Sequence, residues 1–316
     1  MPYYIGVDGG GTKTAYALFN ESAELLLLHE GPGSNHENMA GSFDEAAQIL
    51  WGGLCALLAE AGKTLAEIDF TLMGLAGVDH PFQYDALMER LRARGLEQLE
   101  IFNDGFIVIK AGSQSGAAIG LNCGTGTCCN AIDRQGRRVQ LAGLGEFSGD
   151  AANGMWIATQ AFRLAYDDVL LGIEPTLLSE MIRREFLLAR PEELPSLLAV
   201  LDSPENGEYA KTLIRLFFDA ANAGDAPTLR LVEQMALRGA QLIAAHLRSL
   251  DFPDPAEVVL SGSIHTKLPN KCYLDALTQK AEALSGRKLQ FRLLEQPPVM
   301  GCIQWILQEY VGNGLI

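Results

Sequence analysis

The chain is poor in positive charge and has no long apolar run. Its 24 lysines and arginines are outnumbered by 39 aspartates and glutamates, which gives a net charge of −15. This balance argues against the basic surface that nucleic-acid binding requires. No stretch approaches the roughly 18 apolar residues of a membrane span, and the start, MPYYIGVDGG, lacks the basic-then-apolar order of a signal peptide. We therefore expect a cytoplasmic protein that binds neither nucleic acid nor membrane.

The cysteines follow no zinc or disulfide pattern. The six are Cys55, Cys123, Cys128, Cys129, Cys272 and Cys302, with no CxxC pair and no His–Cys spacing typical of zinc. Without a secretory signal they are predicted to be reduced thiols. A metal or redox role for Cys123, Cys128 and Cys129 is the less favoured alternative, because buried free cysteine is common.

Length and composition are those of a globular chain. At 316 residues, two domains of roughly 100–200 residues each are expected. The strong negative charge means that a bound polyphosphate would have to be neutralised locally, by backbone amides, a lysine and a divalent cation.

A glycine-rich stretch, IGVDGGGTKTAYALF (residues 5–19), has the composition of a phosphate cradle. It is not a P-loop, because Thr12 separates Gly11 from Lys13, and Thr14 stands where a dinucleotide fingerprint needs glycine. The following residues alternate as in a strand, so residues 3–7 and 14–19 are predicted to form a hairpin. Asp8 would end its first strand, with Gly9–Thr12 in the turn. We expect these glycines to take positive φ and aim their amides at phosphate oxygens; a plain glycine-rich turn is the alternative.

The same design occurs a second time. IGLNCGTGTCCNAIDRQG (119–136) repeats the Ile-Gly, an apolar residue, an Asp or Asn, a Gly/Thr turn and a strand of small residues. Two such hairpins indicate a duplicated domain, each copy contributing one phosphate-facing turn.

The remaining pattern predicts an α/β protein of two domains. GPGSNHEN (31–38) is expected to be a loop, and a plain turn at Asn103-Asp104-Gly105 is the alternative to a functional role there. Helices are predicted over 43–62, 82–94, 150–171 and 299–310, with strands over 70–75, 99–102, 138–142, 258–260 and 289–294. Residues 174–250 are predicted to be a helical insertion that the first copy lacks. The domains are expected at 1–112, joined by a C-terminal helix (299–316), and at 113–298.

Five motifs in order carry a resemblance over nearly the whole chain: D-G-G-G-T-K-T, N-D-G, G-T-G-T, a Gly-Asp segment, and S-G-S after a strand. Together they resemble the actin/Hsp70/sugar-kinase superfamily and, within it, the N-acetylglucosamine kinase and BadF/BadG/BcrA/BcrD ATPase group. The resemblance implies two duplicated ribonuclease-H-like domains around an ATP cleft, with ATP and Mg²⁺ bound there. It also implies phosphoryl transfer to a sugar, foremost the 6-hydroxyl of N-acetylglucosamine, and a homodimer.

The resemblance assigns nucleotide contacts residue by residue. Asp8 would hold Mg²⁺ through water. The residues that would meet ATP are Gly9, Gly10, Gly11, Thr12 and Lys13 in the first hairpin, Gly124, Thr125, Gly126 and Thr127 in the second, and Gly262 and Ser263 beside the adenosine.

Asp104 is the candidate catalytic residue. Phosphoryl transfer needs a group that accepts the proton of the attacking hydroxyl, and a carboxylate at the end of a core strand suits that role. The position after the last strand of the first domain is where the resemblance places the base.

The sugar would be held by Asn35, His36, Gly77 and Asp150. Asn35 and His36 resemble the S-x-N-H stretch of N-acetylglucosamine kinases, Gly77 allows close backbone approach, and Asp150 matches the family's Gly-Asp-Glu-Gly-Ser. This chain departs from the pattern at two places. In SGDAANG, Ala151, Ala152 and Asn153 stand where the family has the Glu, Gly and Ser after the aspartate. Before it, Gly143-Leu144-Gly145 stands where the family has Gly-Trp-Gly. For His36 the alternative is an exposed loop residue.

Two other functions stay open. One is a BadF-type ATPase without a sugar acceptor, and the other is a non-catalytic sugar or nucleotide sensor. The cysteine-rich zinc motif of the ROK sugar kinases is missing, and no cysteine is placed to share an iron–sulfur cluster across a dimer axis. A sugar kinase is therefore the leading hypothesis.

Overall fold

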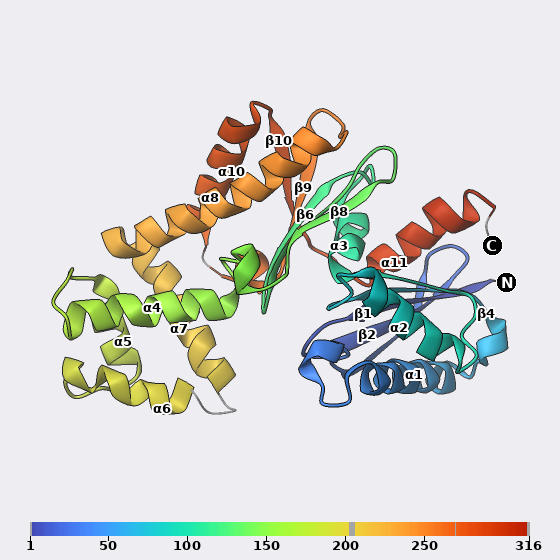
Figure 1. Cartoon of the computed structure of the whole chain (residues 1–316), viewed down its shortest axis with the longest axis horizontal. Helices are drawn as coiled ribbons and strands as arrows, with labels where there is room; N and C mark the ends of the chain where they lie inside the picture. Colours follow the sequence, from blue (N-terminus) through green and yellow to red (C-terminus); the bar gives the residue numbers. More distant parts are fainter. Residues whose placement is uncertain (1, 202–205, 269, 315–316) are drawn as a thin grey trace. The chain divides into compact units, whose positions relative to one another are not determined.

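The computed structural model describes residues 2–201, 206–268 and 270–314 (Figure 1). The chain divides into two compact units. The first comprises Met1–Gly120, Asn130–Gln140 and Arg292–Ile316, and the second comprises Leu121–Cys129 and Leu141–Phe291.

The first sheet has the strand order β3-β2-β1-β4-β5. Its strands are β1 (Tyr3–Gly9), β2 (Lys13–Asn20), β3 (Leu25–Pro32), β4 (Ile68–Leu75) and β5 (Leu99–Asn103). The predicted hairpin is present, since β1 and β2 pair antiparallel, while β1, β4 and β5 run parallel. Strand β3 was not predicted, and it includes Gly31 and Pro32, which were expected to lie in a loop. Its run of consecutive leucines lacks the alternation of apolar and polar residues that predicts a strand. The segment is a strand because it pairs with β2.

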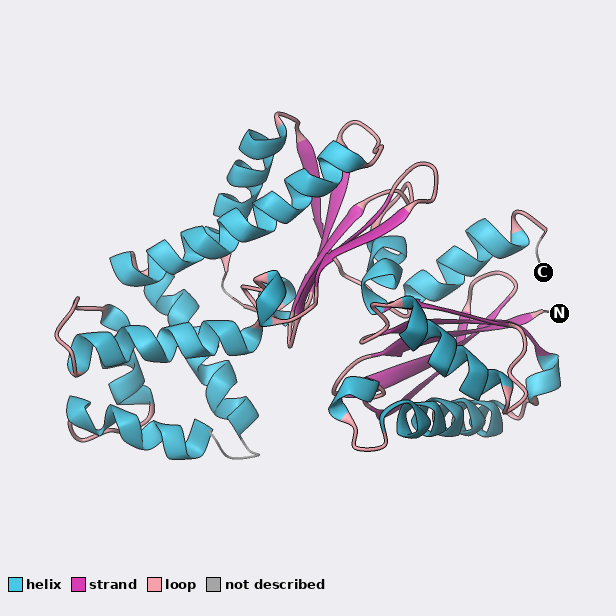
Figure 2. Cartoon of the chain, in the orientation of Figure 1, coloured by secondary structure: helices cyan, strands magenta, loops and turns pink. Residues whose placement is uncertain are grey.

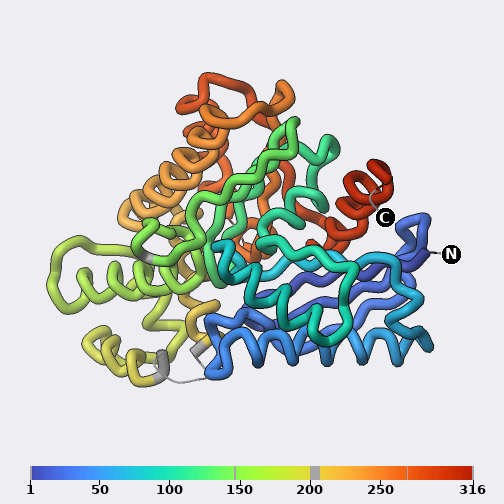
Figure 3. The backbone as a smooth tube through the Cα atoms, turned by 45° about the vertical axis from the view of Figure 1, so that its right-hand side comes forward, coloured from blue at the N-terminus to red at the C-terminus, as the bar shows by residue number. Residues whose placement is uncertain are grey.

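Two helices cover each face of this sheet (Figure 3). On one face lie α1 (Ser42–Ala61) and α2 (Pro81–Arg92), which share a core with Ile5 and Val7. On the other lie α3 (Asp104–Gly112) and α11 (Met300–Trp305), which continues as a π-helix (Ile306–Val311). The side chains of a strand alternate between faces, and Gly6 is placed where α11 comes closest. A Cβ on Gly6 would lie 2.7 Å from Cβ of Cys302, so glycine is what lets the C-terminal helix pack on β1.

The second sheet repeats the order of the first. Its strands run β10-β9-β6-β7-β8, so in both sheets the third, second, first, fourth and fifth strands of a copy are neighbours. They are β6 (Ile119–Cys123), β7 (Thr127–Ile132), β8 (Arg138–Ala142), β9 (Ala256–Ser261) and β10 (Leu289–Leu293). This shared order confirms the duplication predicted from the two hairpins.

The copies differ between their third and fourth strands. The first copy has α1 there, whereas the second has a series of helices (Figure 2). These are α4 (Gly154–Val169), α5 (Leu177–Glu185), the 3-10 helix Pro191–Leu197, α6 (Leu198–Leu201), α7 (Asn206–Asn222) and α8 (Ala226–Ser249). Two further helices, α9 (Ser263–Thr266) and α10 (Lys271–Ser285), follow β9. The helical insertion was predicted; residues 202–205 within it, and 315–316 of the predicted C-terminal helix, lie outside the described residues.

Three local predictions need correction. The helix expected from Asp150 begins at Gly154, because the Asn153 side chain accepts the backbone N–H of Trp156 and caps it. Asn103-Asp104-Gly105 is not a plain turn, because Asn103 ends β5 and caps α3, which begins at Asp104. Residues 36–38 of the expected loop form a 3-10 turn. Within the described ranges, no helix is long and apolar enough to cross a membrane.

Candidate functional site

The site residues predicted from the sequence fall into two groups. Asp8, the first glycine-rich turn, Asn35, His36, Gly77 and Asp104 all belong to the first unit. Gly124–Thr127, Asp150, Gly262 and Ser263 belong to the second.

The first glycine-rich turn is held closely against the loop after β3. Gly10 N–H donates to the Lys13 carbonyl at 3.0 Å, and Ser34 N–H donates to the Gly10 carbonyl at 3.0 Å. A Cβ on Gly33 would lie 2.4 Å from the carbonyl oxygen of Gly11. The residues with positive φ in the described chain do not include Gly9, Gly10 or Gly11, so the predicted reason for these glycines is wrong. They permit close packing of the turn rather than an unusual backbone angle.

Lys13 begins β2 at this turn. Its ammonium pairs with Glu30 of the neighbouring strand β3 at 2.5 Å, and both side chains are exposed. An exposed pair of this kind contributes little to stability and exchanges readily for another anion. The pairing with Glu30 therefore does not hold the Lys13 side chain in one position.

Three aspartates gather where β1, β4 and β5 end. Asp8 is the residue before the last of β1, Asp79 lies in the loop that follows β4, and Asp104 follows β5 directly. The carboxyl ends of neighbouring parallel strands lie at one edge of a sheet, so the three carboxylates influence one another. Burial raises the pKa of Asp104 to about 7, and the negative charges of Asp8 and Asp79 add to that effect.

Asp8 shows the same trend more weakly. Burial raises its pKa to about 6, and the Lys13 ammonium partly opposes the shift. Two carboxyl groups that both titrate near neutrality, in one partly buried place, form a setting in which one of them can act as a base at cellular pH.

Asp79 is a site residue that the sequence analysis missed. Burial raises its pKa, and the hydrogen bond from Gln140 opposes the shift. Its Oδ1 accepts hydrogen bonds from Asn103 Nδ2 at 2.9 Å and Gln140 Nε2 at 2.6 Å. The signal that could have found it is positional, since an aspartate lies near the carboxyl end of each of β1, β4 and β5.

Asn103 fixes the position of Asp104. Its side-chain Oδ1 caps α3 by accepting Gly105 N–H at 2.9 Å, and it also accepts Asn130 Nδ2 at 3.0 Å. A Cβ on Gly105 would lie 2.5 Å from Asn130 Oδ1, so glycine is needed for this close approach. The candidate base thus stands on the first turn of a helix whose start is held by a chain of buried amides.

The structure brings Asn35, His36 and Gly77 together. Gly77 has φ +80°, and a Cβ there would lie 2.4 Å from Asn35 Oδ1 and 3.1 Å from His36 Cε1. His36 is not an exposed loop residue: it is 6% exposed and stacks on Phe43, with ring centroids 4.2 Å apart. Burial lowers its pKa, while the nearby charges of Glu37 and Asp79 oppose that shift, and its buried Nδ1 has no hydrogen-bond partner in the described chain.

In the second unit, the second glycine-rich turn adjoins the loop after β9. Gly262 has φ +84°, and a Cβ there would lie 2.2 Å from the Cys123 carbonyl oxygen, so only glycine fits. A Cβ on Gly124 would lie 3.8 Å from Gly262 Cα and 3.9 Å from Ser263 N. Thr125 and Gly126 are exposed at the tip of the turn. Thr127 is buried, and its hydroxyl donates to the Ala151 carbonyl at 2.8 Å, which fixes the turn to the Asp150 segment.

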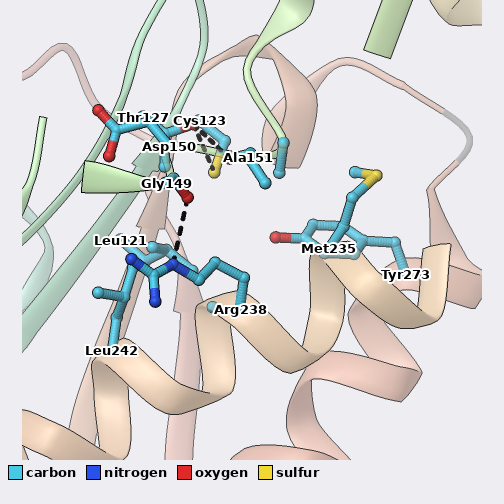
Figure 4. A pocket seen from close by; sticks show the side chains of 12 residues that line it. Leu121, Cys123, Thr127, Gly149, Asp150, Ala151, Met235, Arg238, Leu242 and Tyr273 are labelled. Carbon is cyan, nitrogen blue, oxygen red and sulfur yellow. Dashed lines mark hydrogen bonds between the residues drawn. The ribbon is translucent and has the colours of Figure 1, made fainter. Parts of the chain in front are cut away.

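Asp150 organises its own loop. Its Oδ2 accepts the N–H groups of Gly143 (3.0 Å) and Gly145 (2.8 Å), and its Oδ1 accepts the Ser148 hydroxyl (2.6 Å). Arg238 of α8 supports the loop from the other side by donating to the carbonyl of Gly149 (Figure 4). It also donates to the carbonyl of Ser148. Only about 10 Å³ of space is left between them, roughly the size of one water molecule. The supporting role of Arg238 has no signal in the sequence.

A larger open pocket of about 660 Å³ lies within the second unit. One end is lined by Gly126, Thr127, Gly143, Gly145 and Asp150, so the glycine-rich turn and the Asp150 loop face the same space. The pocket continues along α4.

No group of three or more His, Cys, Asp or Glu side chains is poised to hold a metal ion in the described chain. Magnesium sites in proteins often use only one or two carboxylates together with phosphate oxygens of a bound ligand. Asp8 offers such a carboxylate beside Asp104, where a cation would relieve the repulsion that raises both pKa values.

Two sheets of one strand order, each opened by a glycine-rich hairpin, define the two-domain actin-like fold of ATP-dependent sugar kinases. The chain belongs to the BadF/BadG/BcrA/BcrD ATPase family, whose model matches residues 5–283.

The chain is also similar to two named kinases and to a solved structure. The chain is 25% identical over 238 residues to an N-acetylmuramic acid/N-acetylglucosamine kinase of Clostridium acetobutylicum, covering 75% of this chain and 76% of that protein. It is 26% identical over 235 residues to an N-acetyl-D-glucosamine kinase of Dictyostelium discoideum, covering 70% and 72%. A candidate N-acetylglucosamine kinase of Chromobacterium violaceum has the same fold, with a TM-score of 0.70 at 21% identity over 96% of this chain and 98% of that one. The family and the fold class predicted from the sequence are confirmed.

Proposed function

We propose that the protein is an ATP-dependent sugar kinase that phosphorylates the 6-hydroxyl of N-acetylglucosamine or a related amino sugar. The observation that carries the proposal is Asp104, a fixed carboxyl group whose pKa is about 7. A general base works best when its pKa lies near the working pH. The named activities of the two curated relatives support the choice of acceptor.

Asp104 acts as the base. It takes the proton of the attacking sugar hydroxyl while that oxygen bonds to the γ-phosphorus and the bond to the departing ADP oxygen breaks. The Asn103 cap and the Asn130 amide hold the carboxyl group in place during the transfer. Burial does most to raise the pKa of Asp104, and the negative charges of Asp8 and then Asp79 add to the effect.

The nucleotide is held by backbone amides and one lysine. Gly9–Thr12 and Lys13 contact its phosphates, as do Gly124–Thr127, while Gly262 and Ser263 lie against the adenosine. Lys13 leaves Glu30 for the phosphates, because a polyphosphate carries more charge than one carboxylate. Mg²⁺, when bound, would neutralise phosphate charge, and Asp8 would hold it.

The sugar is held by Asn35, His36, Gly77 and Asp150. Asn35 and His36 are packed on Gly77, which fixes the two side chains beside each other. Asp150 Oδ1 accepts only the Ser148 hydroxyl among the described contacts and retains a lone pair for a ligand. The protein would act in the cytoplasm without nucleic-acid or membrane partners, as its charge and its lack of an apolar span predict, and as a homodimer, as the resemblance implies.

An ATPase without a sugar acceptor is the second candidate, favoured by the altered SGDAANG segment. The test is a coupled assay of ADP release by the purified protein with Mg-ATP and a panel of amino sugars. Turnover that depends on one sugar, with the sugar 6-phosphate identified by mass spectrometry, is the expected result. ADP release of equal rate without any sugar would select the ATPase, and binding of sugar or nucleotide without turnover would select a sensor.

A further inference from the structure

Three polar side chains are buried beside the second glycine-rich turn and have no part in the proposed transfer. They are Cys123 at the end of β6, His265 in α9 and Tyr273 in α10, and none of them is more than 2% exposed. Figure 4 shows the Tyr273 hydroxyl pointing towards the Asp150 loop, across the small space that both line. Burying polar groups costs free energy unless each finds a partner, so a buried polar cluster fixes the arrangement of the groups that it binds.

His265 joins Tyr273 to the end of strand β9. Its Nδ1 lies 2.7 Å from the Ser261 carbonyl oxygen, which can only accept, so Nδ1 carries the proton and donates. Burial lowers the pKa of His265 to about 4, so the ring is neutral and Nε2 is an acceptor. The Tyr273 hydroxyl lies 3.4 Å from Nε2 and donates to it, and the two rings stack with centroids 5.6 Å apart.

Cys123 continues this chain of contacts to the second glycine-rich turn. Burial raises the pKa of Cys123 to about 12, so the thiol keeps its proton, and its side chain forms a hydrogen bond with that of Tyr273. The Thr127 hydroxyl lies 3.9 Å from the Cys123 sulfur and donates to the Ala151 carbonyl at 2.8 Å. The chain of contacts therefore reaches the Asp150 loop.

The two ends of this chain of contacts lie in different ligand loops of the proposed function. One end is the Ser261 carbonyl, at the start of the loop that would hold the adenosine. The other end is the Ala151 carbonyl, in the loop that would hold the sugar, and both loops belong to the second unit. Tyr273 has one hydroxyl for its two neighbours, so a shift at one end changes the hydrogen bonds that reach the other.

We propose that Tyr273 is a positioning residue that couples the Gly262-Ser263 loop to the Asp150 loop, so that nucleotide and sugar strengthen each other's binding. The inference rests on the proposed kinase function and adds a residue that touches neither substrate. Such coupling is reciprocal, because each ligand raises the affinity for the other by the same factor, typically about 5- to 150-fold.

The test measures this coupling factor by calorimetry in wild-type protein and Tyr273→Phe. Adenylyl imidodiphosphate with Mg²⁺ is titrated into the protein with and without saturating N-acetylglucosamine. Phenylalanine keeps the ring and its stacking but removes the hydroxyl, so the factor should fall about three- to tenfold, the contribution of one hydrogen bond. A merely structural Tyr273 would weaken the separate affinities and leave the factor unchanged.

Tyr16→Phe is the matched control. Tyr16 is equally buried in the first unit, and its hydroxyl donates to the Ile49 carbonyl at 3.2 Å, so this variant loses a buried hydrogen bond elsewhere. It should lose stability and keep the coupling factor. Cys123→Ala should lower the factor as Tyr273→Phe does, and the double variant should lower it no further, since both changes break one chain of contacts. Cys123→Ser should restore part of the factor lost in Cys123→Ala.

Hydrogen exchange separates this proposal from the kinase assignment. If no sugar is phosphorylated, the proposed function fails, yet the nucleotide analogue alone should still slow exchange of the Gly143 and Gly145 amides, which donate to Asp150. That slowing should be at least about threefold smaller in Tyr273→Phe. An equal coupling factor in wild type and Tyr273→Phe would overturn the role of Tyr273. Equal slowing in the two proteins, or no slowing in wild type, would overturn it as well.

Discussion

Asn103 Nδ2 donates a 2.9 Å hydrogen bond to Asp79 Oδ1, which ties the end of β5 to the segment that follows β4. The same asparagine caps the helix that begins with Asp104. The position of the candidate base and the charge beside it are therefore set by one buried amide.

Replacing Asp104 by Asn should abolish transfer and spare nucleotide binding. The amide keeps the size of the carboxyl group but cannot accept the hydroxyl proton. We expect kcat to fall about 10²- to 10⁴-fold, the usual contribution of a general base. ATP affinity by calorimetry should stay within about threefold, because the side chain faces the acceptor in the proposed mechanism. A variant that keeps more than about a tenth of wild-type kcat would remove Asp104 from the role of base.

Replacing Asp79 by Asn should move the pH dependence of activity. The base works as a carboxylate, so kcat/KM should rise with pH and level off above about pH 7. A negative neighbour raises the pKa of Asp104, so removing that charge lowers it and shifts the midpoint to lower pH. Asparagine still offers an oxygen to Asn103 and Gln140, which preserves the packing. A midpoint that stays in place, in a folded variant, would mean that Asp79 does not tune the base.

The raised pKa values of Asp8 and Asp104 also make stability depend on pH. A carboxyl group with a higher pKa in the folded protein binds its proton more tightly there, so its stabilising effect is complete at low pH. That effect is lost as pH rises from about 4 towards 6 for Asp8 and 7 for Asp104. Asp104→Asn should therefore gain thermal stability relative to wild type at pH 8 and little at pH 4, measured by calorimetric Tm. An equal difference at both pH values would contradict the assigned pKa.

Replacing Gly33 by Ala should displace the first glycine-rich turn, although residue 33 lies in the loop packed against that turn and not in the turn itself. The new Cβ would meet the Gly11 carbonyl oxygen at 2.4 Å, so the turn must shift. We expect ATP affinity to fall about tenfold, since misplaced amides lose charge-assisted hydrogen bonds to phosphate.

Gly52→Ala is the matched control for Gly33→Ala. Gly52 lies in α1 with open space around its Cβ position, and Ala there should stabilise the helix by roughly 0.5–1 kcal/mol without changing ATP affinity. If Gly33→Ala and Gly52→Ala bind ATP alike, the turn is not a phosphate cradle.

Substituting Gly77 by Ala should raise KM for the sugar. Position 77 has φ +80°, and the new Cβ would displace the Asn35 side chain. Gly95→Ala is the control that measures the stability lost by placing alanine at positive φ alone, because Gly95 has φ +96° and no atom within 4 Å of its Cβ position. Both changes should cost about 1–2 kcal/mol of stability, but only Gly77→Ala should raise KM, by about tenfold. Equal KM values in the two variants would remove Asn35 from the sugar site.

The sequence by itself determined the parts of this protein that depend on neighbouring residues. The alternation around Gly9–Thr12 predicted the first hairpin, its recurrence at Ile119 predicted the duplicated fold, and aspartates after strands predicted Asp8 and Asp104. Each of these is a local pattern, because hairpin pairing and strand ends are set by residues close together in the chain.

Only the tertiary structure determined which segments far apart in the sequence lie beside these residues. Asp79 joins the carboxylates through hydrogen bonds from Asn103 and Gln140, and His36 is buried because Phe43 stacks on it. Gly33 matters because its loop packs on Gly11, and Arg238 because α8 lies beneath the Asp150 loop. Burial, pKa and steric limits arise from contacts between residues far apart in sequence, and composition and spacing do not encode which of those contacts form.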